Sequence, residues 1–233
     1  MKVNCVWEHN GNDTLLYAVD HIGAYTRGQT LAIAMAKMPQ EIASYLKWLG
    51  KTPADATDIM IVEEKASELA IKDADSDVLF ESEQVPLTIE EYDKLKNLAL
   101  KSAKDFLALY DSIPDKSATA KAERKTFYGQ VPRSAYEMYE HTKNVNAYYF
   151  AEIDISSNNS GNIYDCRKHG FEALEAKPGF LKNAVAEGSY AEAWSLRKVI
   201  RRFIWHDRIH AKAMYRMAVK VFGAENIENP FCF

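Results

Sequence analysis

The segment WHDRIH holds two histidines four residues apart, His206 and His210. On a helix, residues four apart project from one face about one turn from each other, so both imidazoles could bind one divalent ion. The same spacing also occurs between ordinary core histidines that are hydrogen-bonded, and it does not separate the two cases by itself. The direction of the two rings has to be inferred from the residues that share their face of the helix.

Residues 189–222 are expected to form one helix, because Ser189 and Glu192 match a capping box and Gly223 suits the position that ends a helix. At about 100° per residue, both histidines fall in its apolar stripe. The stripe consists of Val199, Phe203, His206, His210, Met214, Met217 and Val221. The opposite face is interpreted as the solvated one and carries Lys198, Arg201, Arg208, Lys212 and Arg216. The two imidazoles are therefore predicted to point inward.

A third histidine, His141, lies in residues 131–153, which also have helical periodicity. It shares an apolar stripe with Met138, Val145 and Tyr148. Three inward imidazoles from two helices would give a divalent ion three nitrogen ligands and leave positions for water or substrate, as in catalytic sites. Ligation by imidazole alone favours zinc or nickel, although iron and copper also suit it. We predict a metal site made of His141, His206 and His210.

Asp207 and Glu137 are candidates for orienting a ligand imidazole, since such rings usually donate their second nitrogen to an acceptor. The alternative for Asp207 is a surface carboxylate paired with a neighbouring base, and Glu137 is equally ambiguous. Tyr148 and Arg202 could line a pocket, but a core tyrosine and a solvated arginine are the favoured interpretations. Trp205 falls on the charged side of its helix, so we expect the N-terminal domain or a dimer partner to cover it.

Four helices are expected in the C-terminal part of the chain. The first, residues 88–113, begins at a capping box of Thr88 and Glu91 and ends before Pro114. Residues 131–153, 164–177 and 189–222 give the others, joined by connections of medium length. This pattern predicts an all-α four-helix bundle over residues 87–233.

The N-terminal part, residues 1–86, has a different periodicity. Strands are expected at residues 3–7, 14–19 and 58–65, with a helix between the second and third that starts at Thr30 and ends at Gly50. Pro39 is expected to restart a second helical segment. We predict a small α+β domain, with the boundary between residues 75 and 88.

Both parts resemble known families. The helices EMYEHTKNVNAYYF and RKVIRRFIWHDRIH look like the second and fourth helices of the DinB-like superfamily, which includes bacillithiol transferases and mycothiol-dependent isomerases. The resemblance covers roughly residues 88–222 and implies His141, His206 and His210 as metal ligands. The segment GAYTRGQTLAIAMAKMPQEIASYL resembles the HicB-like antitoxin domain, over about residues 1–70, without a separate DNA-binding segment.

Two functions follow as expectations. The first is a metal-dependent enzyme, a hydrolase or thiol S-transferase acting on a small molecule, in which the ion activates a bound water or thiol. No catalytic residue beyond the ligands is assigned. The second is a non-enzymatic binding or regulatory protein with a HicB-like partner-binding domain and a metal-stabilised bundle. A position left open for water or substrate beside the three ligands would favour the enzyme. A fourth protein ligand would favour the metal-stabilised bundle.

The bulk composition excludes other classes. Lys and Arg total 29 against 33 Asp and Glu, a net charge of −4, so nucleic acid is an unlikely partner. The three cysteines show no zinc or disulfide spacing and are interpreted as reduced thiols. No apolar segment is long enough to span a membrane or to serve as a leader, and we expect a cytoplasmic protein that could form a homodimer.

Overall fold

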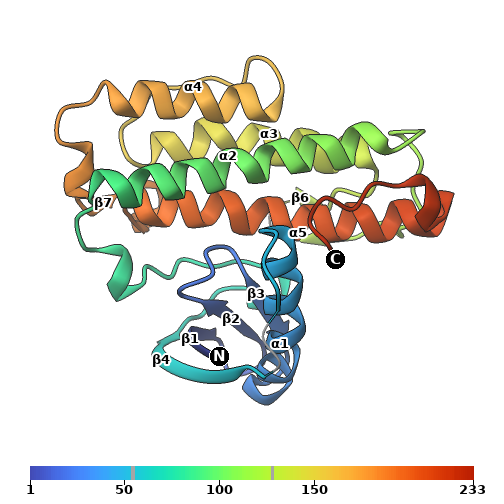
Figure 1. Cartoon of the computed structure of the whole chain (residues 1–233), viewed down its shortest axis with the longest axis horizontal. Coiled ribbons are helices and arrows are strands. Elements are labelled where there is room, and N and C mark those ends of the chain that lie inside the picture. The colour runs from blue at the N-terminus through green and yellow to red at the C-terminus, as the bar shows by residue number, and fades with distance from the viewer. Residues whose placement is uncertain (54–55, 127–128) are drawn as a thin grey trace.

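The computed structural model describes residues 1–53, 56–126 and 129–233 of the chain. In Figure 1 a small sheet with one helix lies beneath a layer of long helices. The elements of the N-terminal part are β1 (Lys2–His9), β2 (Thr14–Ala18), β3 (Tyr25–Gly28), α1 (Leu31–Trp48) and β4 (Asp58–Ala66). The long helices of the C-terminal part are α2 (Ile89–Ser112), α3 (Ala135–Ala151), α4 (Ile163–Glu175) and α5 (Leu196–Phe222). Short hairpins join them, formed by β5 (Lys125–Thr126) with β6 (Gly129–Gln130) and by β7 (Ala186–Glu187) with β8 (Ala193–Trp194).

The four strands β1–β4 form a mixed sheet in the order β3-β2-β1-β4. β1, β2 and β3 are antiparallel neighbours, and β4 pairs with β1 in parallel after the crossover through α1. Successive side chains of β1 point to opposite faces of the sheet, and the register shift between Cys5 and Val6 places one extra residue, Val62, on β4. Val3 and Cys5 therefore pack in the same core as α1, whereas Val6 packs with Leu15 on the other side of the sheet. Both faces of this sheet contribute buried residues.

α1 is one continuous helix, which corrects the expectation that Pro39 starts a second segment. Thr30 caps it as predicted, since its hydroxyl accepts from the Ile33 N–H. Pro39 removes one helical donor, but it lies on the exposed side, where water can satisfy the carbonyl left without a partner. Met38 and Ile42 are buried in the core on either side of Pro39, and this packing keeps the helix continuous.

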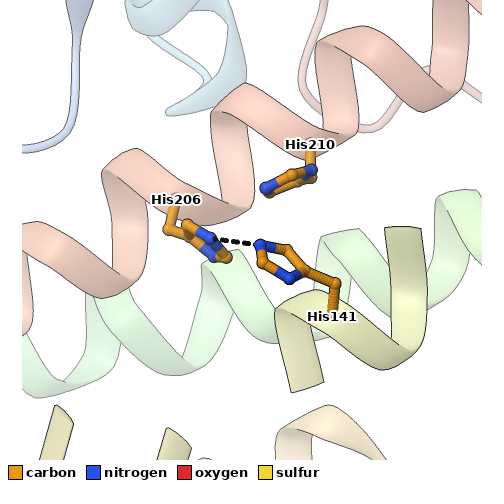
Figure 2. A group of neighbouring side chains, drawn as sticks. All are labelled: His141, His206 and His210. Carbon is orange, nitrogen blue, oxygen red and sulfur yellow. Dashed lines mark hydrogen bonds between the residues drawn. The ribbon is translucent and has the colours of Figure 1, made fainter. Parts of the chain in front are cut away.

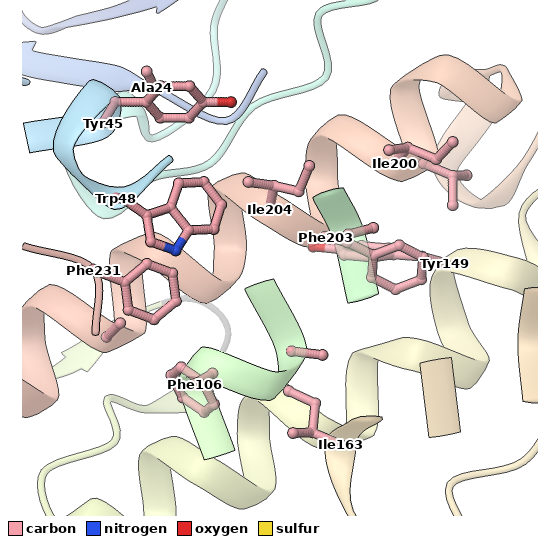
Figure 3. Close-up of a cluster of buried hydrophobic side chains, with 14 of the residues drawn as sticks. Ala24, Tyr45, Trp48, Phe106, Tyr149, Ile163, Ile200, Phe203, Ile204 and Phe231 are labelled. Carbon is pink, nitrogen blue, oxygen red and sulfur yellow. The ribbon is translucent and has the colours of Figure 1, made fainter. Parts of the chain in front are cut away.

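The C-terminal part contains the four expected helices. α2 and α3 each pack against both α4 and α5. Capping boxes begin three of the helices, at Thr88 for α2, Ser134 for α3 and Asn162 for α4. The buried apolar residues of these helices join those of the N-terminal part in one cluster (Figure 3). Its members include Tyr45 and Trp48 of α1, Phe106 of α2, Tyr149 of α3, Ile163 of α4 and Phe203 of α5.

α5 begins at Leu196, later than the sequence indicates. Ser195 is its N-cap and accepts from the Lys198 N–H, whereas the expected cap, Ser189, lies in the tight turn between β7 and β8. Tyr190 in that turn has a φ of 60°, which a helix does not allow. The carboxylate of Glu192 pairs with Lys198 at 2.8 Å instead of closing a capping box. The C-terminal end at Gly223 agrees with the prediction.

Most of the charged face of α5 is covered, and not solvated as the sequence suggests, although Arg216 near its end is exposed. The N-terminal part packs on it, and Trp205, only 2% exposed, packs against Tyr17 and Tyr25. The expected cover over Trp205 is therefore confirmed, and the N-terminal part provides it. Arg208 pairs with Glu41 of α1 at 2.8 Å. Two further basic side chains of this face, Lys198 and Arg201, are likewise buried.

The segment between the two parts contributes to the same packing. Residues 67–88 run from the end of β4 to the start of α2, so the predicted boundary at residues 86 and 87 falls inside it. Glu83 of this segment pairs with Arg201, and Val78 and Phe80 pack in the cluster that contains Trp205. No helix among the described residues is long and apolar enough to cross a membrane.

Candidate metal centre

The three predicted ligands come together between α3 and α5 (Figure 2). His206 and His210 project from one face of α5, and His141 faces them from α3. The Nε2 atoms of His141 and His206 lie 3.2 Å apart. The ring centroids are 5.0 Å apart for His141 and His206, 4.7 Å for His141 and His210, and 4.5 Å for the α5 pair. One nitrogen of each ring lies within 4.8 Å of one nitrogen of every other ring.

These distances suit a shared ion. Two imidazole nitrogens bound to one zinc ion at about 2.0–2.1 Å are separated by at most about 4.2 Å. The 3.2 Å distance between the Nε2 atoms of His141 and His206 is inside that limit. The three nitrogens all lie within 4.8 Å of one another, so a small rotation of the rings would bring every pair inside it. The prediction that the three rings converge is confirmed. The three residues are close enough to hold a metal ion.

The rings have an environment that keeps them neutral. Burial lowers the pKa of His141 and, together with the two neighbouring histidines, lowers the pKa of His206 well below its usual value. Burial and the nearby His141 and Lys121 lower the pKa of His210 to about 3. Neutral imidazoles have the free nitrogen lone pairs that a metal needs.

The second nitrogen of His206 has no acceptor. His206 is 9% exposed, and its Nδ1 atom is buried without a hydrogen-bond partner among the described residues. Leaving such an atom unpaired costs free energy, and a ligand imidazole usually has an acceptor at this position. Nε2, the atom turned toward His141, is the nitrogen of His206 that can bind a shared ion.

Asp207 has a different role from the one expected of it. Both of its carboxylate oxygens accept from Arg167 of α4, so neither the bond to a ligand imidazole nor the surface pairing has a counterpart in the described chain. The reason is rotation: the next residue on a helix points about 100° away, and Asp207 therefore faces α4 where His206 faces α3. The Arg167 side chain also donates to the Ala99 carbonyl of α2 and the Asn146 amide oxygen of α3.

Glu137 also serves the backbone. Its carboxylate accepts from the backbone N–H groups of Arg133 and Ser134 at 2.7 and 3.1 Å, and it closes the capping box that begins α3. These bonds lower the pKa of Glu137. No bond from this carboxylate to a histidine exists in the described part of the chain. Glu137 therefore positions His141 only indirectly, by fixing where α3 starts.

A large cavity opens beside the three histidines. Its volume is about 1410 Å³, and its walls come from both parts of the chain and from the segments between them. Tyr25 and Glu41 of the N-terminal part line it together with His206 and His210. A cavity with titratable groups in its wall is a candidate small-molecule site.

Two cavity residues were assigned to other roles from the sequence. Tyr148 is 39% exposed and lines the cavity, so it is not a core residue. Arg202 also lines the cavity and is partly covered, so it is not a solvated surface arginine. The helical spacing gave a signal for Arg202, because it precedes His206 by four residues. Arg202 was interpreted as solvated because a charged side chain is usually exposed.

Comparison with known proteins supplies no function for this chain. No family model matches it, and neither any curated protein nor any solved structure does so. Its function must therefore be argued from the site itself.

Proposed function

We propose that this protein is a metal-dependent enzyme of the DinB-like kind. In this proposal α2, α3, α4 and α5 form a DinB-like four-helix bundle, and His141, His206 and His210 hold one divalent ion, zinc or nickel. The substrate is a small molecule, and the reaction is hydrolysis or thiol transfer. The observation that carries the proposal is the convergence of three neutral imidazoles in the wall of a large cavity.

The open side of the site favours catalysis over structure. Structural zinc sites are closed by four protein ligands, whereas catalytic sites have three and leave a position for water or substrate. In the described chain no carboxylate or thiol joins the three histidines in the cluster. The cavity beside the rings gives a small molecule access to that remaining position.

The residues of the chain have separate tasks in this proposal. A bound divalent ion lowers the pKa of a coordinated water or thiol and makes it nucleophilic near neutral pH. The histidines bind the ion, and their lowered pKa values keep the rings neutral. Tyr148, which is 39% exposed in the cavity wall, gives an aromatic surface against which an apolar part of the substrate can pack.

The N-terminal part is, on this proposal, a component of the substrate site. Tyr25 of β3 and Glu41 of α1 line the cavity, and the ion pair of Glu41 with Arg208 fixes α1 against α5. A separate partner-binding module, as the HicB-like resemblance implies, would not need to share a core and a cavity wall with the helices. The regulatory alternative therefore has less support.

Elemental analysis of the full chain, purified without a metal-affinity tag, tests the metal site. We expect about one divalent ion per chain, and much less in His141→Ala, His206→Ala and His210→Ala, because two remaining imidazoles hold an ion poorly. His169→Ala is the control, since His169 is exposed on α4 and outside the cluster. Unchanged metal content in all three cluster variants would place the ion elsewhere and overturn the proposal.

Activity tests the enzyme assignment. The chain is loaded with zinc or nickel and assayed for hydrolysis of an aryl ester and for substitution of an aromatic halide by a small thiol, with release of halide and a proton. We expect at least one rate to rise with metal content and to fall in His206→Ala, while His169→Ala matches the original chain. Rates independent of metal content in both assays would contradict the enzyme and favour the scaffold.

A further inference from the structure

Arg202 lies one helical turn before His206 on α5, in the wall of the same cavity. Side chains four residues apart on a helix are separated by about 5–6 Å at their Cβ atoms. The guanidinium group therefore lies within the length of a small molecule from the histidine cluster. Its charge also acts on the cluster, since Arg202 contributes to the lowered pKa of His206 after burial and the other histidines.

The guanidinium group of Arg202 is held on an aromatic surface. Its central carbon lies 4.7 Å from the ring centroid of Trp205 and 5.5 Å from that of Tyr149. NH1 donates to the Ser76 carbonyl at 2.9 Å. The Nε atom is buried and has no hydrogen-bond partner among the described residues. The group is thus fixed in place with donor capacity left over.

Arg202 differs from the other covered cations of α5. Each of the others has a carboxylate partner: Arg197 with Glu91, Lys198 with Glu192, Arg201 with Glu83, and both Arg208 and Lys212 with Glu41. Within the described chain, Arg202 forms no ion pair with any carboxylate. A partly buried arginine without a counter-ion in a cavity wall is a natural place for an external anion.

We propose that Arg202 binds the carboxylate of a small-molecule substrate whose reacting bond lies at the histidine cluster. This inference rests on the proposed function and specifies its substrate class. The spacing along α5 requires a short acid, in which only a few bonds separate the carboxylate from the reacting bond. Trp205 and Tyr149 pack against the apolar part next to the carboxylate.

A carboxylate suits the site better than a phosphate. Arg202 donates from NH1 to the Ser76 carbonyl and its side chain also bonds to that of Tyr149, so Nε is the unpaired donor that a carboxylate oxygen can take. Glu192 and Glu8 are near enough to raise the pKa of Arg202, so the surroundings already carry negative charge. A single-charged anion meets less repulsion there than a doubly charged one.

Calorimetric titration of the metal-free full chain tests the inference without activity. Acetate, succinate and benzoate are the carboxylate probes, benzamide is the uncharged counterpart of benzoate, and inorganic phosphate is the competing anion. We expect saturable binding of at least one carboxylate, weaker binding of phosphate and none of benzamide. Using metal-free chain removes direct ligation of the probe to the ion.

Arg202→Gln should weaken carboxylate binding about tenfold or more, as expected for loss of a charge-assisted pair. Arg202→Lys keeps the charge but loses the planar set of donors, so its affinity for carboxylate should lie between those of the original chain and Arg202→Gln. Arg216→Gln is the matched control, because Arg216 is exposed on the same helix and lines the same cavity. A melting curve for each variant confirms that it is folded.

The outcomes separate this inference from the metal proposal. Carboxylate binding that is unchanged in Arg202→Gln, that is matched by benzamide, or that is exceeded by phosphate would overturn it. So would the absence of binding by every carboxylate probe, even where elemental analysis finds the ion at the histidines. Conversely, carboxylate binding that depends on Arg202, together with elemental analysis that finds no metal in the untreated chain, would support the anion site and contradict the proposed function alone.

Discussion

Asp207 and Arg167 form a two-point ion pair with no exposed surface on either side chain. NH1 lies 2.5 Å from Oδ2, and NH2 lies 3.0 Å from Oδ1. Asp207 is the neighbour of His206 on α5, and Arg167 reaches it from α4. Because Arg167 also bonds to α2 and α3, this pair ties all four long helices together behind the histidine cluster.

Removing one member of this pair should destabilise the protein strongly. Asp207→Asn leaves the Arg167 charge buried without compensation, and we expect a loss of about 3–5 kcal/mol in the free energy of unfolding, measured by urea denaturation. Lys168→Ala is the control, since Lys168 and Glu172 are exposed on the same α4 and their pair contributes less than about 1 kcal/mol. A loss below about 1 kcal/mol in Asp207→Asn would contradict the structural role.

The ion pair between α1 and α5 should hold the N-terminal part in place. Burial alone would raise the pKa of Glu41, but Arg208 and Lys212 outweigh it and lower that pKa. Glu41→Gln leaves Arg208 buried among aromatic rings without its counter-ion, and we expect a loss of about 3 kcal/mol. Glu172→Gln, at an exposed position, should change stability little.

Glu41 also predicts a pH effect of known sign. A carboxylate whose pKa is lowered in the folded chain stabilises it above the unfolded pKa, here 4.5, and this stability is lost as the pH falls further. Stability differences between Glu41→Gln and the original chain should therefore be constant from pH 7 to 5 and shrink below that. A difference that does not shrink on acidification would contradict the ion pair.

The histidine cluster was predictable from the sequence because it follows from local periodicity. The i, i+4 spacing of His206 and His210 and the apolar stripe around His141 both depend only on the geometry of a helix. The long helices could be placed for the same reason. The capping box at Thr88 is a local hydrogen-bond pattern, and the structure has it.

The burial of the charged residues of α5 depends on contacts with distant parts of the chain, and no local sequence pattern contains such contacts. Arg201 and Arg208 were placed on a solvated face because charge usually indicates solvent, yet Glu83 and Glu41 from distant parts of the chain cover them. Both interpretations of Asp207, as an acceptor for a ligand imidazole and as a surface partner of a neighbouring base, missed its pair with Arg167 of α4. A charged face interrupted by a large indole, Trp205, was the one sign in the sequence of a covered surface.

The histidines predict a second pH effect, separate from that of Glu41. Because their pKa values are lowered in the folded metal-free chain, the unfolded chain binds more protons below about pH 6.5, and stability should fall as the pH drops from 7 to 5. His206 and His210 each add a slope of up to about 1.4 kcal/mol per pH unit. Urea denaturation at each pH measures it.

The control for this effect is the double variant His206→Gln with His210→Gln, which has no imidazole on α5 to protonate within the cluster. Its stability should fall less between pH 7 and 5, because only His141 and His21 then have imidazole pKa values lowered by burial. An equal fall in the double variant and the original chain would assign the effect to other groups. Adding zinc to the original chain should offset the fall, because the ion binds only neutral imidazoles.

The start of α5 gives the last prediction, since the sequence and the structure choose different serines for it. Ser195 is fully buried, and its hydroxyl accepts from the Lys198 N–H and donates to the Glu83 carbonyl at 2.8 Å. We expect Ser195→Ala to cost about 1–2 kcal/mol in thermal or urea denaturation, because a helix cap and a buried carbonyl both lose their partner. Ser189→Ala should cost less than about 0.5 kcal/mol, as the turn that contains it begins no long helix. The reverse order of the two losses would mean that α5 begins at the capping-box pattern and that the hairpin of β7 and β8 does not form.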